Sequence, residues 1–214
     1  MKIVCLSDTH NCNGQIVVPD GDVLIHSGDA TITGTQYEIE LFSRWFAGLP
    51  HKYKIFVAGN HDWLFEQDRM SAESLLDMGI IYLQDSFAMI DGLKFYGSPW
   101  QPRFYDWAFN LMRGPEIAEK WRMIPDDVEV LITHGPPNGI LDIVPTRWGT
   151  ENAGCEELRL RISELGGAGK LKLHVFGHIH CGHGMHEEFG VRFVNASICD
   201  EQYAPTQEPL VVDL

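Results

Sequence analysis

The stretch LKLHVFGHIH, residues 171–180, joins a run typical of a buried strand to a glycine and two histidines. Apolar residues up to Phe176 predict the strand, and the glycine directly after it marks the strand's end. In an extended segment His178 and His180 point the same way, because alternate residues of a strand share a face. Such a pair is either a polar turn or a pair of metal ligands. If they are ligands, other ligand residues should follow neighbouring strands.

Four further strand candidates do end in metal-ligand residue types. They are IVCLSDTH with Asp8 and His10, VLIHSGD with Asp29, KIFVAGNHD with Asn60, His61 and Asp62, and VLITHG with His134. In α/β proteins, ligands bind beyond the carboxyl ends of the strands, so neighbouring strands can bring these residues to one crevice. Alone, Gly-Asp is ordinary turn chemistry. The five segments together predict one site.

The alternation of strand and helix candidates predicts an α/β fold. The predicted strands are Lys2–Ser7, Val23–His26, Lys54–Ala58, Val128–Thr133, Leu171–Phe176, Val191–Asn195 and Leu210–Asp213, with a hairpin turning at Asp91-Gly92. The predicted helices are Thr35–Leu49, Ser71–Met78, Pro115–Met123 and Cys155–Leu165. Thr35 and Glu38 fit a capping box, and Tyr37, Leu41, Phe42 and Phe46 fall on one predicted apolar face of the first helix.

The composition favours one globular domain, residues 1–214, and excludes a basic nucleic-acid-binding surface. Lys and Arg number 16 against 30 Asp and Glu, for a net charge of −14. A sequence-independent grip on a nucleic-acid polymer needs the opposite balance. Five cysteines without a CxxC pair indicate reduced thiols, and no apolar run is long enough to cross a membrane, so we expect a cytoplasmic protein. The oligomeric state is open, and a homodimer is compatible with the sequence.

The predicted ligand set favours two transition-metal ions. It has two carboxylates, four imidazoles and one amide oxygen, supplied by Asp8, Asp29, His10, His134, His178, His180 and Asn60. These donors suit Mn, Fe or Zn rather than calcium or an iron–sulfur cluster. Seven ligands exceed the needs of one tetrahedral ion, so we expect two divalent ions that share one carboxylate. Ion pairs about 3.5–4 Å apart are a common device for hydrolysing phosphate esters.

The series DTH, GD, GNHD, THG and GHIH resembles the calcineurin-like metallophosphoesterase superfamily from Asp8 to His180. The segments LPHKYKIFVAGNHD, YLQDS, FYGSPWQPRFYDWAFN, THGPPNGILD and VNASICDEQY resemble its small MPPED-type branch of cyclic-nucleotide phosphodiesterase relatives. The resemblance implies a layered α/β fold, a four-layer αββα sandwich in which helices flank two mixed β-sheets.

The same resemblance implies a role for each motif residue. Asp8, His10, Asp29 and His180 would hold the first ion, and Asp29, Asn60, His134 and His178 the second, with Asp29 as the bridge. A hydroxide between the ions would attack phosphorus in line. His61 would be catalytic rather than a ligand, steadying the phosphoryl oxygens or protonating the leaving oxygen. Some relatives have glycine in place of His178, so the histidine here predicts an intact second metal site.

The departures from other branches favour a small phosphodiester, such as a cyclic nucleotide, as the substrate. Protein Ser/Thr phosphatases extend the second motif to GDxVDRG and carry arginine before GNHE, whereas this chain has GDATIT and Ala58. DNA-repair nucleases of the same fold add a capping domain and a basic surface. A phosphomonoesterase with the same metals is the first alternative. A non-catalytic interaction module is disfavoured because such proteins usually lose ligands or the GNH histidine.

The aromatic stretch 97–114 is predicted to be either a packed loop or a wall of the substrate pocket. We predict Trp100, Arg103 and His183 as wall residues from their proximity and chemistry. Cys181 is a second residue near the ligands, and a turn explains it and His183 equally well. The other histidines are expected to be structural, with His26 and His174 in the core and His51 and His186 in solvent.

Overall fold

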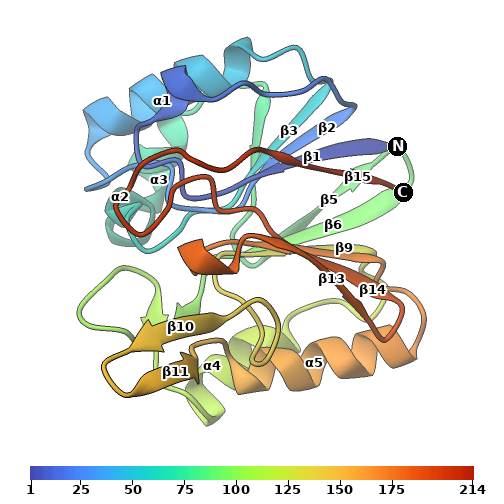
Figure 1. Ribbon diagram of the computed structural model, residues 1–214. Coiled ribbons are helices and arrows are strands. Elements are labelled where there is room, and N and C mark those ends of the chain that lie inside the picture. Colours follow the sequence, from blue (N-terminus) through green and yellow to red (C-terminus); the bar gives the residue numbers. More distant parts are fainter.

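The computed structural model describes residues 1–214 and arranges them in four layers (Figure 1). Two β-sheets pack face to face, with helices on the outer face of each. This confirms the predicted αββα sandwich. The helices α1 Gln36–Gly48, α2 Trp63–Gln67 and α3 Arg69–Ser74 pack on the outer face of the first sheet, and α4 Pro115–Arg122 and α5 Glu156–Gly167 pack on that of the second. In Figure 1, α1 lies at the top, α2 and α3 at the left, and α4 and α5 at the bottom.

Both sheets are mixed, with parallel strands in the middle and antiparallel strands at an edge. The first has the order β15 Leu210–Asp213, β1 Lys2–Leu6, β2 Val23–His26, β3 Tyr53–Phe56 and β4 Ile80–Tyr82. The second has the order β13 Gly184–Glu188, β14 Val191–Asn195, β12 Leu173–Phe176, β9 Val130–Thr133, β6 Leu93–Ser98 and β5 Ser86–Ile90. No helix has the length and apolar character needed to span a bilayer.

Three apolar layers hold these four layers together. Between the sheets lies a cluster that includes Cys5, Ile25 and Val175. Val4 and Leu24 point the other way, into the cluster under α1 to α3. Because the central strands are buried on both faces, they read as continuous apolar runs rather than as alternating ones. A third cluster fills the space between the second sheet and the helices α4 and α5.

The long helix begins where the sequence predicts, but its exposed face differs from the prediction. Thr35 and Glu38 form the predicted capping box at the start of α1. Phe42 and Phe46 are buried, whereas Tyr37 and Leu41 are exposed, so their placement on the buried face was wrong. In this segment Ile39 takes the buried place, which rotates the apolar stripe away from Tyr37.

Two other regions depart from the predicted elements. The helix predicted at Ser71–Met78 begins and ends earlier, as α3, because the Asp68 carboxylate accepts a hydrogen bond from the Ser71 amide and caps it. The polar hairpin of β10 Ile143–Thr146 and β11 Gly149–Asn152 was not predicted, since it has no buried face to create a pattern. The hairpin at Asp91-Gly92 is confirmed, and both residues have positive φ.

The carboxyl ends of the inner strands meet at one side of the sandwich. The strands β1, β2 and β3 run parallel in the first sheet, and β9, β12 and β14 run parallel in the second. A bridge between Ser7 and Ser197 joins the two sheets at these ends. The short pairs β7 Gln101–Pro102 and β8 Asn110–Leu111, and the 3₁₀ turns η1 Asn13–Gln15 and η2 His180–Gly182, lie in the connecting loops.

Candidate functional site

The predicted ligand side chains from five strand exits converge on Asp29. Its Oδ2 lies 3.4 Å from His134 Nε2 and 3.8 Å from His10 Nε2. Asn60 joins at the same nitrogen, with its Oδ1 2.9 Å from His134 Nε2. Asp8, Asp29 and His134 are almost wholly inaccessible to solvent. Buried carboxylates and imidazoles in one cluster require compensation by charge, which bound cations provide.

The donor atoms fall into three groups, and Asp29 belongs to two of them, one of which it forms with His10 and His61. One group comprises Asp8, His10 and His180, with 3.5 Å from Asp8 Oδ1 to His180 Nε2 and 3.4 Å between the Nε2 atoms of the two histidines. Another comprises Asp29, His134 and His178. Nitrogen ligands of one tetrahedral ion lie about 3.3 Å apart, so this spacing fits metal coordination.

Backbone carbonyls orient three of the four predicted imidazole ligands. The Nδ1 atoms of His10, His134 and His180 contact the carbonyls of Thr31, Ser27 and Asp200 at 3.2, 3.0 and 2.8 Å. An Nδ1–H donated to a carbonyl leaves the Nε2 lone pair directed at the cluster, as in most metal-binding histidines. The fourth, His178, differs because its buried Nδ1 has no hydrogen-bond partner. That unpartnered donor atom also fits a metal ligand.

The turns after the strands hold the carboxylates through unusual backbone conformations. Asp8, Asp29 and His178 have φ of 52°, 55° and 69°, in the left-handed region that residues other than glycine seldom adopt, although Asp and His enter it more readily than most. Close approach requires glycine beside them. A Cβ on Gly59 would lie 2.3 Å from Asp29 Oδ1, and one on Gly177 would lie 2.1 Å from Asp8 Oδ2. The glycines of GNHD and GHIH therefore make room for the carboxylates.

The electrostatics of the cluster favour bound positive charge. Burial would raise the pKa of Asp8, but the hydrogen bond and charge of His180 hold it well below its ordinary value. The Asp29 pKa is lowered in the same way by His134. Although burial opposes protonation, these carboxylates raise the pKa values of His134 and His180 to about 9. Protons therefore compete with metal ions for the imidazoles.

His61 lies beside the cluster and is oriented separately from it. Its amide donates to Asp29 Oδ1 at 2.8 Å, and its Nδ1 lies 2.7 Å from the Ile32 carbonyl. Its Nε2 lies 4.0 Å from Asp29 Oδ2. Asp62 is fully buried. Its carboxylate accepts hydrogen bonds from the Gly59 and Thr31 amides and thereby ties the GD and GNHD turns together.

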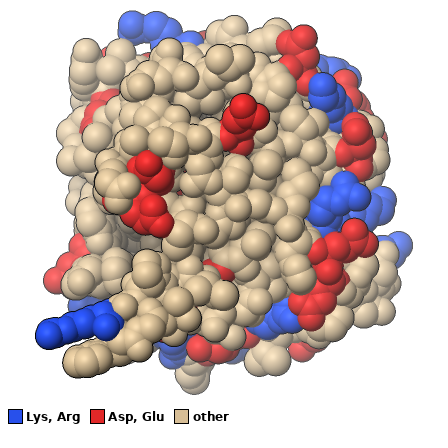
Figure 2. Space-filling model, in the orientation of Figure 1, with Lys and Arg blue, Asp and Glu red and all other residues tan.

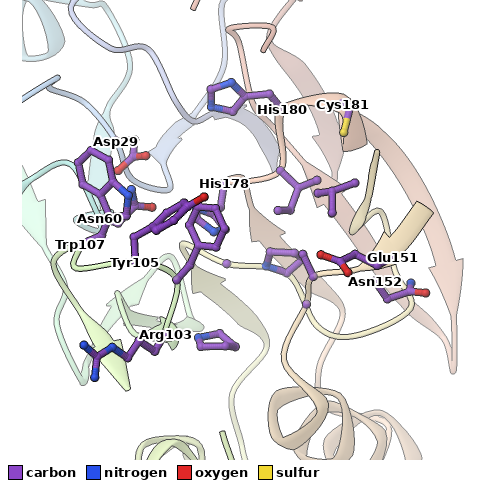
Figure 3. A pocket seen from close by; sticks show the side chains of 18 of the residues that line it. Asp29, Asn60, Arg103, Tyr105, Trp107, Glu151, Asn152, His178, His180 and Cys181 are labelled. Carbon is purple, nitrogen blue, oxygen red and sulfur yellow. The ribbon is translucent and has the colours of Figure 1, made fainter. Parts of the chain in front are cut away.

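The cluster opens into a cavity of about 850 Å³ (Figure 3). Asp29, Asn60, His178 and His180 lie at its metal-ligand end, while the stretch from Arg103 to Trp107 and the hairpin residues Glu151 and Asn152 form opposite walls. Arg103 therefore lies where the sequence predicts. Cys181 also lines the cavity, where its Sγ contacts the Ile143 carbonyl and burial raises the pKa of its thiol.

Two predicted wall residues lie elsewhere. The Trp100 indole donates to Asp85 Oδ2 at 2.9 Å and packs against Phe109, which turns it away from the cavity. His183 is half-buried with its Nδ1 2.9 Å from the Ser197 carbonyl, and it does not line the cavity. The adjacent residues that do face the site are Trp107, stacked on His61 with ring centroids 4.2 Å apart, and Tyr203, 4.7 Å from the His10 ring.

Known proteins are similar to this chain over most of its length. A family model described as calcineurin-like phosphoesterase matches residues 1–182. The chain belongs to this family. Metallophosphoesterase domain-containing protein 1 of Homo sapiens is 43% identical over 236 residues, which cover 100% of this chain and 71% of that protein. UPF0046 protein K07C11.7 of Caenorhabditis elegans is 38% identical over 224 residues, covering 99% and 74%. A probable rhamnogalacturonate lyase C of Emericella nidulans is 38% identical over 194 residues, covering 86% and 17%.

In this calcineurin-like phosphoesterase, residues that follow a sixth strand, β14, also contribute to the site, and the sequence analysis did not predict them. The segment after β14 supplies the Ser197 hydroxyl, which donates to Asp8 Oδ2 at 2.8 Å, and the Asp200 carbonyl, which orients His180. It also supplies Tyr203 to the wall. The polar run NASICDEQY after the apolar VRFV was the available signal, because it repeats the strand-then-polar pattern of the other five.

The remaining histidines are largely structural, as expected. His26 and His174 are fully buried, with Nε2 atoms 3.0 Å from the Thr9 hydroxyl and 2.8 Å from the Thr133 hydroxyl. His186 is exposed, as predicted. The prediction of a solvated His51 is wrong: its ring is buried, and its Nε2 lies 3.0 Å from the Pro19 carbonyl.

Substituting His178 tests the second donor group without disturbing the fold. His178→Gly removes an imidazole at a residue whose φ of 69° suits glycine. We expect the metal-free variant to unfold at the wild-type temperature or above it, and to bind its weaker divalent ion at least about 10-fold less tightly. Scanning calorimetry and metal titration measure the two effects. His183→Ala is the control, and wild-type metal affinity in His178→Gly would rule out His178 as a ligand.

Glu38 in α1 braces the turn that follows Asp29. Its carboxylate accepts hydrogen bonds from the Asn11 amide group at 2.7 Å, the Ile32 amide at 3.2 Å and the Thr33 hydroxyl at 2.7 Å. Because the Ile32 carbonyl contacts His61, this carboxylate supports the site from outside.

Glu38→Gln should lower the free energy of unfolding near neutral pH by about 1 kcal/mol. Burial would raise the Glu38 pKa, but hydrogen bonds from Thr33, Thr35 and Asn11 lower it from 4.5 to about 2. The carboxylate therefore stabilises the fold above its unfolded pKa, and this contribution is lost as the pH falls toward 2. Denaturant unfolding at pH 7 and pH 3 should show a smaller difference between variant and wild type at pH 3. Glu40→Gln is the control, and a difference that grows at pH 3 would contradict the assignment.

Proposed function

We propose that the protein is a dinuclear metal-dependent phosphodiesterase for small phosphodiesters, with cyclic nucleotides among the candidates. Asp8, His10 and His180 would hold one ion, and Asn60, His134 and His178 the other, with Asp29 shared between them. Mn, Fe and Zn all accept such ligands. Two bound divalent ions would polarise the phosphoryl oxygens and lower the pKa of a water for attack on phosphorus.

The preference for a diester rests on the charges around the cavity. Its only lysine or arginine side chains are Arg103 and Arg113. Arg103 pairs with Asp106 at 2.8 Å, and Arg113 pairs with Glu156 and donates to two backbone carbonyls. Both guanidinium groups already have a carboxylate partner, which reduces the positive charge available to the second charge of a phosphomonoester. A diester carries one negative charge, which matches this wall better than a dianion does.

The shape and the surface charge support a small substrate. A cavity of about 850 Å³ is within the usual range for small-molecule sites. Basic side chains on the face shown in Figure 2 are interleaved with acidic ones and form no continuous track for a polynucleotide. Five unpaired cysteine thiols support the reducing cytoplasm as the compartment.

His61 can supply a proton that the ligands cannot. With Nδ1–H donated to the Ile32 carbonyl, its Nε2 faces Asp29 and the cavity. A protonated Nε2 could donate to a phosphoryl oxygen or to the departing ester oxygen of a bound substrate. The imidazole needs no bond to a metal for either role.

A comparison of two diesters with one monoester tests the proposed substrate class. Bis(p-nitrophenyl) phosphate, p-nitrophenyl phosphate and 2′,3′-cyclic AMP would be assayed with Mn²⁺, Fe²⁺ and Zn²⁺. We expect kcat/KM for the diesters to exceed that for the monoester by at least about 10-fold, or about 1.4 kcal/mol. Faster monoester hydrolysis would favour a phosphomonoesterase instead. A metal-loaded protein that hydrolyses none of them would favour a non-catalytic interaction module.

A further inference from the structure

The ring of Trp107 covers one face of the His61 imidazole. The ring centroids are 4.2 Å apart and the planes are inclined by 33°, which is a tilted face-to-face contact rather than an edge contact. The His10 ring approaches the same imidazole edge-on, at 4.8 Å and 79°. In Figure 3 the Trp107 indole lies beside Asp29 and Asn60, at the metal-ligand end of the cavity.

The backbone around Trp107 is tied directly to the turn that carries His61. The Ala108 amide donates to the Asn60 carbonyl at 3.2 Å, so the residues that follow Trp107 and precede His61 are hydrogen-bonded. On the other side, the Gln101 side chain donates to the Ala108 carbonyl at 3.0 Å. Ala108 and Gln101 are buried, whereas Tyr105 is exposed. The indole therefore sits at the anchored end of a loop whose tip is exposed.

We propose that Trp107 is a positioning residue for His61, an inference that rests on the proposed function. The Ile32 carbonyl holds the imidazole at Nδ1, and the His10 ring meets it edge-on, so neither contact covers the face on which the indole lies. The indole closes that face to water and limits rotation of the ring, so Nε2 stays directed at the ester oxygens. A small misplacement of a catalytic group is enough to lower the rate by about 10²-fold.

The contact between the Trp107 and His61 rings can be observed without an activity assay. Ring-current shielding by the indole should move the carbon-bound imidazole protons of His61 upfield in the metal-free protein. These resonances are identified by their loss in His61→Ala. In Trp107→Ala they should move downfield, whereas in Trp148→Ala, which changes an exposed indole at the tip of the β10–β11 hairpin, they should not. Unchanged His61 resonances in Trp107→Ala would overturn the stack.

A double-mutant cycle tests the catalytic consequence. Trp107→Ala should lower kcat for a diester by about 10-fold with KM changed less than about 3-fold, and Trp107→Phe should restore most of the loss because it keeps a flat ring. In the His61→Ala background, Trp107→Ala should cost less than about 2-fold. Trp148→Ala should match the wild type.

The outcomes separate this inference from the proposed function. Equal losses from Trp107→Ala in both backgrounds, or a loss confined to KM, would overturn the positioning role and make Trp107 a wall that binds substrate. Failure of Trp107→Phe to recover activity would also count against it. A wild type that hydrolyses no ester overturns the proposed function and this inference together, whereas an active wild type with additive losses overturns only the inference.

Discussion

Asp29→Asn should lower kcat/KM for phosphoesters by at least about 10³-fold, equivalent to about 4 kcal/mol of transition-state stabilisation. Asp29 is the only carboxylate placed between the groups of donors, within 4.0 Å of the Nε2 atoms of His10, His61 and His134. Asparagine keeps the Oδ1 that accepts the His61 amide but replaces the charged oxygen at the centre with a neutral amide. The variant should fold, yet lose the shared ligand and with it the second divalent ion.

The chain offers a matched control at the other end of the same strand. Gly21-Asp22 precedes β2 as Gly28-Asp29 follows it, and Asp22 Oδ2 accepts a hydrogen bond from the Lys2 amide far from the cavity. Asp22→Asn should keep wild-type turnover and metal content. If Asp29→Asn retained both as well, the shared-ligand assignment would be wrong.

The second large effect is expected at His61. His61→Ala should lower kcat by about 10²- to 10⁴-fold, the usual contribution of a general acid or base. Metal content should be unchanged, because the imidazole is oriented by the Ile32 carbonyl and is not required to complete either group of ligands. Parallel measurements of steady-state rates and bound metal check both expectations, and exposed His186→Ala is the control.

The geometry at His61 is compatible with two roles, a metal ligand or a proton donor, and the two can be distinguished by experiment. With His10 and Asp29 it forms a third group of potential donors, so loss of a metal ion in His61→Ala would make it a ligand. If it protonates the leaving oxygen, the loss should be larger for alkoxide than for nitrophenolate leaving groups, since good leaving groups need less help. Turnover equal to that of the wild type would remove it from the mechanism.

The sequence predicts the site better than the surroundings of the site. The candidate ligands Asp8, Asp29, His134 and His178 all come within three residues of the end of strands that are buried on both faces, so apolar runs locate them and parallel pairing brings them together. Supporting contacts were missed because many use main-chain carbonyls, such as those of Asp200 and Ser27, whose positions no residue type reveals. Contacts of that kind depend on the path of the chain.

The aromatic loop shows a second limit of prediction from the sequence. Trp100 and Trp107 lie seven positions apart in one stretch, and composition alone gives no reason to prefer either as a wall residue. The partly buried carboxylate of Asp85 accepts the hydrogen bond of the Trp100 indole, while the hydrogen bond from Ala108 to Asn60 brings Trp107 to the site. His51 shows the same limit away from the site, because only the folded chain reveals the Pro19 carbonyl that its ring nitrogen contacts.

Titration of metal-free protein with Mn²⁺, followed by metal content and diester turnover in the same samples, tests the central claim most directly. A dinuclear phosphodiesterase should bind about two equivalents per chain, with most of the turnover arriving with the second. Asp29→Asn should bind fewer and stay inactive. Binding of two equivalents without hydrolysis of any ester would contradict the account. So would full diester turnover by the metal-free protein before Mn²⁺ is added.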